Sequence, residues 1–210
     1  MERVVSVRRA HGVAYVTLTD ERVFTLPSAV YSNHRLYEGE PFDETVYARL
    51  MALFAYPAAL ERAGKLLSAK EYSEQEIGKK LRASAYDEET ITRVLNRLKE
   101  AGFLSDARFA GLYAQSRMKK HGRARVMQEL KQKGVAAEDV KDALAAFSEE
   151  DEVKVAAKQA AKLLKNKTPS PDDKRRALAA LARRGFSYSV ARRALEHAAG
   201  VDDDIDPEES

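Results

Sequence analysis

Residues 121–144 read HGRARVMQELKQKGVAAEDVKDAL, and two other segments of the chain align to them without a gap. These are YSEQEIGKKLRASAYDEETITRVL at residues 72–95 and DDKRRALAALARRGFSYSVARRAL at residues 172–195, so the offsets are 49 and 51 residues. Self-similarity at a fixed period is the signature of tandem structural repeats. The sequence therefore predicts three copies of one unit.

Apolar residues recur at five places in each aligned segment. They are Ile77, Leu81, Tyr86, Ile91 and Leu95, then Val126, Leu130, Val135, Val140 and Leu144, then Ala177, Leu181, Phe186, Ala191 and Leu195. This spacing predicts two packed helices per segment, because residues three to four apart share one helix face. Gly134 and Gly185 stand between the two helices, where a left-handed residue ends the first one, and Ala85 fills that place in the first segment.

A further helix precedes each pair, at residues 58–70, 105–120 and 150–165, so the unit has three helices. Side chains or backbone suited to N-caps are found at Ser73, Asp87, Ser105, Gly122, Asp173 and Ser187. One unit buries little apolar surface alone, so neighbouring units should stack. We expect a mainly helical fold of three tandem three-helix repeats that form an elongated, curved rod.

The beginning of the chain has a different pattern. Three short runs, VVSVRR, AYVTLT and RVFTL, are separated by His11-Gly12 and Asp20-Glu21, which predict hairpin turns. Pro27 ends the third run, a short helix follows at about residues 28–36, and Asp43 caps another helix. The repeats are therefore preceded by a small β-hairpin and helical subdomain.

The expected domains follow from these patterns. They are a β-rich N-terminal extension over 1–56, three-helix repeats over 57–104, 105–149 and 150–199, and a disordered acidic tail over 200–210. The last ten residues, VDDDIDPEES, hold six acids and no base, so the net charge of +3 conceals a charge of +9 on residues 1–200. A basic body predicts a polyanionic partner or an acidic protein surface. The tail either adds solubility or competes locally for the basic body.

Several classes of protein find no support in the composition. The chain has no Cys, and its four histidines, His11, His34, His121 and His197, are far apart and form no metal-binding pair. No phosphate loop or nucleophile motif is present. No apolar run approaches the roughly 20 residues of a membrane helix, and the start lacks a signal-peptide core. We expect a cytoplasmic protein that is not an enzyme and uses no cofactor or metal.

Basic residues are the candidate binding residues. Lys154, Lys158, Lys162 and Lys165 share one helix face, where like charges four residues apart cost about 0.2–0.5 kcal/mol per pair. Such a stripe is either a solvated face or a contact for an acidic partner or a phosphate backbone. The other candidates are Arg117, Lys119, Lys120, Arg123, Arg125, Lys131 and Lys133 in the second repeat, and Arg175, Arg176, Arg183, Arg184, Arg192 and Arg193 in the third. The helix dipole explains charge at the end of a helix but not Arg123 and Arg125, which begin one.

Three motifs in these repeats resemble the RecX family. Residues 98–117, LKEAGFLSDARFAGLYAQSR, are similar to its hallmark Leu-Lys-x-x-Gly-[Tyr/Phe]-Leu-[Asp/Ser]-Asp-x-Arg-Phe-Ala segment. HGRARVMQELKQKGV is similar to the family's Gly-x-x-[Arg/Lys]-[Ile/Val]-x-x-Glu-Leu-x-x-Lys-Gly stretch, and LARRGFSYSVARRAL contains its Arg-Arg-Gly-Phe-Ser motif at residues 183–187. The resemblance covers roughly residues 57–198 in the right order, and the β-rich beginning resembles that of longer members.

The resemblance implies a function. RecX-like proteins bind the RecA protein filament on single-stranded DNA, block its extension or promote its disassembly, and lower ATP hydrolysis and strand exchange. The chain is thus expected to act as a monomer that contacts RecA and, directly or through RecA, single-stranded DNA. Two alternatives remain open: a direct DNA-binding protein, since the short turns between paired helices are similar to helix-turn-helix units, and a generic helical scaffold.

Overall fold

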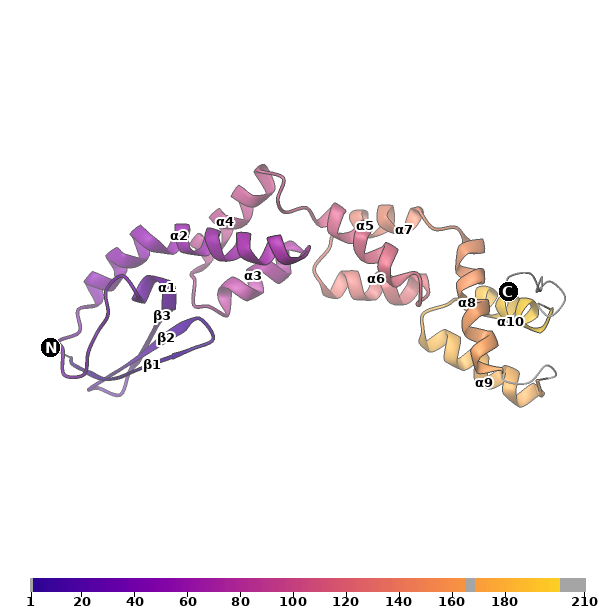
Figure 1. Cartoon of the computed structure of the whole chain (residues 1–210), viewed down its shortest axis with the longest axis horizontal. Helices are drawn as coiled ribbons and strands as arrows, with labels where there is room; N and C mark the ends of the chain where they lie inside the picture. Colours follow the sequence, from indigo (N-terminus) through magenta and orange to yellow (C-terminus); the bar gives the residue numbers. More distant parts are fainter. Residues whose placement is uncertain (1, 165–168, 201–210) are drawn as a thin grey trace, which may run out of the picture. The chain divides into compact units, whose positions relative to one another are not determined.

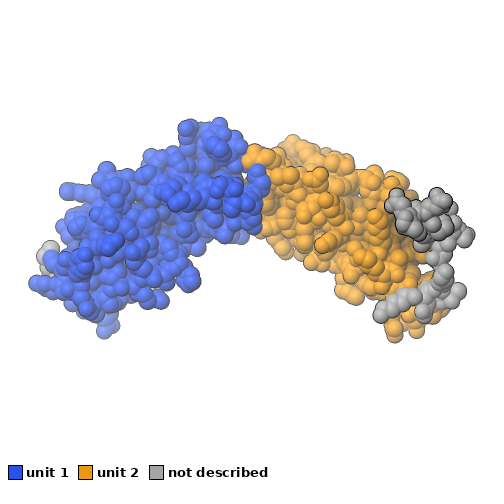
Figure 2. All heavy atoms as spheres, in the orientation of Figure 1, with its two compact units in different colours: residues 1–105 blue, residues 106–210 orange. Residues whose placement is uncertain are grey.

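A computed structural model of the chain describes residues 2–164 and 169–200. The predictions for Lys165 and for residues 201–210 therefore lie outside the described residues. The chain divides into two compact units, residues 1–105 and 106–210, which Figure 2 shows in blue and orange. Each unit is described by itself below.

Unit 1 begins with the predicted sheet. Strands β1 (Val4–Ala10), β2 (Val13–Leu18) and β3 (Val23–Pro27) form an antiparallel sheet in the order β1-β2-β3 (Figure 1). His11 and Gly12 form the first turn with φ of 52° and 83°, the left-handed conformation that a tight hairpin needs. The predicted hairpins are therefore confirmed.

The helices that follow the sheet differ from the prediction. Helix α1 (Ser28–Tyr31) is shorter than expected, and α2 (Glu44–Ala69) is a single helix in place of two. Asp43 caps α2 as predicted, accepting a hydrogen bond from the Thr45 backbone N–H at 2.9 Å. The predicted boundary between residues 56 and 57 falls inside this helix, beside Pro57. Buried small residues on both sides of Pro57 hold the helix together against the core of unit 1, and these are Ala55, Ala59 and Ala63.

The rest of unit 1 is the helix pair of the first repeat, α3 (Glu74–Arg82) and α4 (Glu88–Glu100). Ser73 and Glu76 form the predicted capping box at the start of α3. Between the helices, Ala85 has φ of 62°, the left-handed conformation predicted for this position. The sheet and these helices share one hydrophobic core.

Unit 2 contains two three-helix groups (Figure 1). The first comprises α5 (Asp106–Arg117), α6 (Arg123–Gln132) and α7 (Ala137–Ala145). The second comprises α8 (Glu149–Leu163), α9 (Pro171–Arg183) and α10 (Tyr188–Gly200). Each group has its own cluster of buried residues, and Gly134 and Gly185 adopt φ of 81° and 86° where the predicted turns fall.

The apolar positions of the repeat form these cores. All fifteen aligned positions are buried except Leu95, which is partly buried. One cap is corrected: α9 begins after Ser170, whose hydroxyl accepts from the Asp173 backbone N–H at 3.2 Å, so Asp173 is the third helical residue and not the cap. A mainly helical fold of three three-helix units, with an antiparallel sheet before them, is confirmed.

Candidate partner-binding surface

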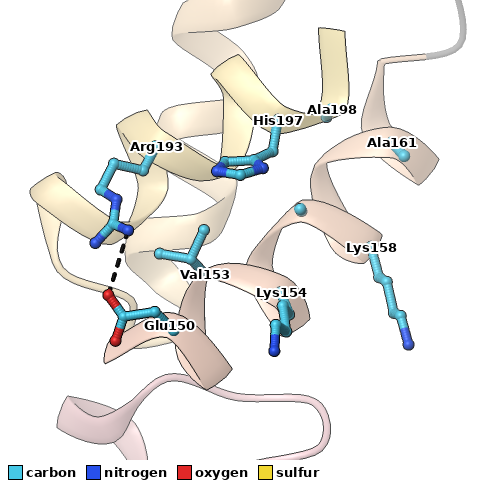
Figure 3. A pocket seen from close by; sticks show the side chains of 9 residues that line it. Glu150, Val153, Lys154, Lys158, Ala161, Arg193, His197 and Ala198 are labelled. Atoms are coloured by element: carbon cyan, nitrogen blue, oxygen red, sulfur yellow. Dashed lines mark hydrogen bonds and ion pairs between the residues drawn. The ribbon is translucent and has the colours of Figure 1, made fainter. Parts of the chain in front are cut away.

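The lysine stripe on α8 is present as an exposed face. We use "lysine face" for Lys154, Lys158 and Lys162, which are all exposed and make no hydrogen bond or ion pair with any other described residue. The opposite side of α8 carries Val153, Ala156 and Ala160, which are buried in the core of the third repeat. Figure 3 shows the side chains of Lys154 and Lys158 pointing away from α10. Packing of the apolar side therefore places the lysine face toward solvent.

A groove runs between α8 and α10 beside the lysine face (Figure 3). Its volume is about 360 Å³, and Val153, Ala157, Ala161 and Ala198 give it an apolar lining. At one end, Arg193 forms ion pairs with Glu149 at 3.0 Å and Glu150 at 3.5 Å. The groove thus combines an apolar floor with exposed lysines along one rim.

Arg123 has a role within the fold that the sequence did not reveal. Its Nε donates to Glu152 Oε1 at 2.8 Å, and its two Nη atoms donate to the backbone carbonyls of Leu144 at 3.0 Å and Phe147 at 2.6 Å. Glu152 belongs to the third repeat and is only 5% exposed. Arg123 therefore links the second repeat to the third through an ion pair. This contact explains why a basic residue stands at the start of α6, where the helix dipole disfavours positive charge.

The Glu129 carboxylate accepts hydrogen bonds from three neighbouring side chains. Arg117 donates to both of its carboxylate oxygens at 2.7 and 2.8 Å, Arg125 donates at 3.0 Å and the Tyr113 hydroxyl at 2.9 Å. The Arg117 hydrogen bonds are the main reason that the pKa of Glu129 falls to about 2, and burial opposes them. Arg117 and Arg125 are thus engaged in structure, and Glu129 offsets part of their charge.

His121 lies beside these arginines, where its charged form is disfavoured. Its Nδ1 is buried without a hydrogen-bond partner among the described residues. Burial lowers the pKa of His121, and the nearby Arg117 and Arg125 guanidinium groups lower it further. Both causes disfavour the charged form of this imidazole, which occupies the turn before α6.

The remaining candidates separate into paired and unpaired groups. Side-chain contacts engage Lys133 with the Phe109 and Tyr113 rings, Arg175 with Asp172, Arg184 with Gln159, Arg192 with Glu196, and Arg193 with Glu149 and Glu150. Within residues 2–164 and 169–200, no hydrogen bond or ion pair engages the side chains of Lys119, Lys120, Lys131, Arg176, Arg183 or the lysine face. These unpaired cations are the part of the predicted surface that folding does not explain.

Two observations concern other kinds of site. Among the described residues, no three His, Cys, Asp or Glu side chains lie where they could hold a metal ion together. In the same part of the chain, none of the helices is both long enough and apolar enough to cross a membrane.

The fold and this surface define a class of protein: a tandem array of three-helix units whose exposed faces carry unpaired lysine and arginine. Comparison with known families makes the class specific. The family models for the first, second and third three-helix domains of RecX match residues 59–98, 105–144 and 149–195. The matches fall on each of the three units found from the sequence alone.

Individual relatives agree with the family match. The regulatory protein RecX of Chromobacterium violaceum is 36% identical over 144 residues, which are 69% of this chain and 91% of that protein. That of Bacillus velezensis is 28% identical over 205 residues, covering 95% of this chain and 78% of the relative. A crystal structure of regulatory protein RecX superposes with a TM-score of 0.64 and 25% identity over 93% of this chain and all of the other. A structure of RecX from Lactobacillus salivarius shares the fold with the same TM-score, over 70% of this chain and 97% of its own. The chain belongs to the RecX family of regulatory proteins.

Proposed function

We propose that the protein is a negative regulator of the RecA recombinase. It binds the RecA filament on single-stranded DNA, blocks filament extension or promotes disassembly, and so lowers ATP hydrolysis and strand exchange. It acts by binding alone, as a cytoplasmic monomer without a cofactor. Membership of the RecX family supports this role, and the lysine face of α8 is the observation that carries it to particular residues.

The electrostatics of unit 2 suit a polyanionic partner. Exposed lysines spaced four residues apart repel each other. Asp151 lies near enough to Lys154 to feel its charge, whereas Lys158 and Lys162 form no ion pair with any described residue. A phosphate backbone or an acidic protein face supplies the missing countercharge. Lys119, Lys120, Lys131, Arg176 and Arg183 extend the same chemistry, so the binding energy would come from many modest contacts.

Ion pairs within the fold separate the predicted binding residues into two groups. Arg117, Arg123 and Arg125 have carboxylate partners inside the fold, so their first contribution is to stability. The lysine face has no such partners among the described residues. We therefore place the partner contact on the lysine face, with the other unpaired cations beside it.

The direct test is RecA ATPase activity on single-stranded DNA with and without the full chain. We expect ATP hydrolysis to fall as the protein is added, and the effect to weaken as salt rises, because phosphate contacts are screened and exchange with counterions. Unchanged hydrolysis at low salt would contradict the proposal. A bandshift on naked duplex and single-stranded DNA, without RecA, is the companion measurement: tight, sequence-specific duplex binding would favour a direct DNA-binding protein instead.

A further inference from the structure

The groove between α8 and α10 has the chemistry of a docking site for one particular segment of this chain. We propose that residues 201–210, VDDDIDPEES, bind back onto this groove, with their carboxylates on the lysine face and their apolar side chains on the groove floor. The acidic segment would then occupy the basic surface of its own protein until a stronger polyanion displaces it.

The first argument is charge complementarity. The groove rim carries Lys154 and Lys158, and Lys162 continues the line along α8. The charge of Lys154 acts on Asp151, and Lys158 and Lys162 form no ion pair among the described residues. The segment carries six acids and no base. At one end of the groove, Glu149 and Glu150 pair with Arg193. The positive charge available to the acidic segment therefore lies toward the other end, at Lys158 and Lys162.

The second argument is position and reach. Helix α10 ends at Gly200, and residue 201 follows directly. His197 and Ala198, one turn earlier, line the groove opposite α8 (Figure 3). Ten residues span at most about 33–36 Å when extended. Because an α-helix rises about 1.5 Å per residue, the 15 residues of α8 are shorter than this reach.

The third argument is the match between two periodicities. Lysines four residues apart on a helix lie about 6 Å apart along its axis. In an extended chain, alternate residues lie on one side and are about 6.6 Å apart. In the docked state that we propose, an extended segment would present Asp202, Asp204 and Asp206 as a row of negative charges whose spacing matches that of the positive lysine face.

The opposite side of such an extended segment would carry the apolar residues Val201 and Ile205. The groove floor offers Val153, Ala157, Ala161 and Ala198 to receive them. Burial of these apolar side chains adds to the free energy of docking that the charges provide. Salt screens only the charges, so docking should weaken with salt but should not be abolished. Because the segment is tethered, its effective concentration at the groove is on the order of millimolar, and a weak intrinsic affinity suffices.

The docking itself does not depend on RecA. Its regulatory consequence rests on the proposed function: the segment would compete with the partner for the lysine face and would set a threshold for binding. A protein with a docked segment should bind a short oligonucleotide several-fold more weakly than a protein without it.

Docking is tested by comparing amide NMR spectra of the full chain and of a chain that ends at Gly200. We expect the amide shifts of residues 154–162 and 193–198 to differ between the two, while those of α6 and α7 stay the same. The synthetic peptide VDDDIDPEES, added to the shortened chain, should move the same amides toward their full-chain positions. Identical α8 and α10 shifts in the two chains, or a peptide response confined to residues 119–131, would overturn the proposal.

Two further variants separate the charge and apolar contributions within the full chain. Lys158→Glu and Ile205→Ser should each shift the amides of residues 154–162 toward the spectrum of the shortened chain, whereas Lys141→Glu, an exposed lysine on α7, should not. Removal of the segment should also raise the affinity for a single-stranded oligonucleotide several-fold at low salt. The proposal fails if the oligonucleotide changes the α8 amide shifts equally in both chains and binds both with equal affinity. The groove would then bind nucleic acid and not the acidic segment.

Discussion

Arg123 and Glu152 form an ion pair across the junction between the second and third repeats, with 2.8 Å between Nε and Oε1. Glu152 is buried, and its Oε2 accepts a second hydrogen bond from the backbone N–H of Arg123 at 3.3 Å. The same guanidinium caps the backbone carbonyls of Leu144 and Phe147 near the end of α7. One side chain therefore fixes the end of one repeat and the beginning of the next.

Removal of this pair should destabilise unit 2. Arg123→Ala leaves the Glu152 carboxylate buried without its partner, which costs about 3–5 kcal/mol. Arg123→Lys should recover only part of the loss, because an ammonium group cannot make the three directed contacts of the planar guanidinium. Urea unfolding followed by circular dichroism measures both variants, with Lys120→Ala as the exposed control. An Arg123→Ala midpoint equal to that of the control would show that the pair is not structural.

Gly122 and Gly185 bring two backbones together at the same junction. The Gly122 N–H donates to the Arg184 carbonyl at 2.9 Å, and a Cβ at Gly122 would lie 2.3 Å from the Gly185 carbonyl oxygen. Gly122→Ala should therefore cost about 1–3 kcal/mol through overpacking. Gly111 in α5 is the matched control, since its added Cβ would meet nothing within 4 Å and Ala should stabilise the helix by about 0.5–1 kcal/mol. Shifts of the same sign for both variants in urea unfolding would contradict this explanation.

The pKa of Glu129 predicts a dependence of stability on acid. Its pKa is about 2 in the fold, below the ordinary value of 4.5, because Arg117 and Arg125 donate hydrogen bonds to the ionised carboxylate. A lowered carboxyl pKa contributes stability that is complete above the unfolded pKa and disappears as pH falls through the folded value. The contribution of Glu129 should therefore be lost between pH 4.5 and about 2.

Glu129→Gln isolates this contribution. The variant should be less stable at neutral pH by about 1–3 kcal/mol, the usual worth of hydrogen bonds to a charged group. The gap to the wild type should narrow as pH falls from about 4.5 toward about 2, because Glu129 of the unfolded chain takes up its proton in this range while Glu129 of the folded chain still resists protonation. Thermal unfolding across this pH range measures the gap. A constant difference between the two proteins at every pH would refute the role given to ionised Glu129.

Most of the fold could be predicted because its signals are local. The apolar positions of the repeat lie within 24-residue segments, and for those inside helices burial follows from helix periodicity. Tyr86, Val135 and Phe186 lie in the turns between the paired helices, directly after the left-handed residue. Gly134 and Gly185 mark the left-handed turns, and Ala85 adopts the same conformation at some cost to a residue with a Cβ. The continuity of α2 through Pro57 was not predictable, because it depends on tertiary packing of the flanking alanines.

The candidate surface was predicted less completely, for a related reason. The lysine face follows from spacing along one helix, and the structure leaves it unpaired among the described residues. The hydrogen-bond partners of Arg123 are 21, 24 and 29 residues away along the chain, so no local sequence pattern predicts them. Arg125 and Glu129 lie four residues apart on one helix, and that spacing was the available signal for the Glu129 cluster.

Charge reversal on the lysine face should weaken inhibition of RecA without weakening the fold. Lys158→Glu combined with Lys162→Glu removes two contacts to a charged partner, each worth roughly 1.5–3 kcal/mol if it is a hydrogen-bonded one. The concentration that half-inhibits RecA ATPase should rise by at least about tenfold. Lys79→Glu combined with Lys141→Glu makes the same change in net charge at exposed lysines that form no ion pair among the described residues, and it should leave inhibition nearly unchanged.

The charge-reversal experiment needs the lysine face, because other basic residues also stabilise the fold. Reversal of Arg123 and Arg125 would break their ion pairs with Glu152 and Glu129, so lost inhibition there would reflect lost structure as well as lost contact. Circular dichroism and unfolding midpoints should remain those of the wild type for the Lys158 and Lys162 double variant, whose side chains have no ion pair to lose among the described residues. Equal half-inhibition by this variant and the wild type would move the RecA contact away from α8.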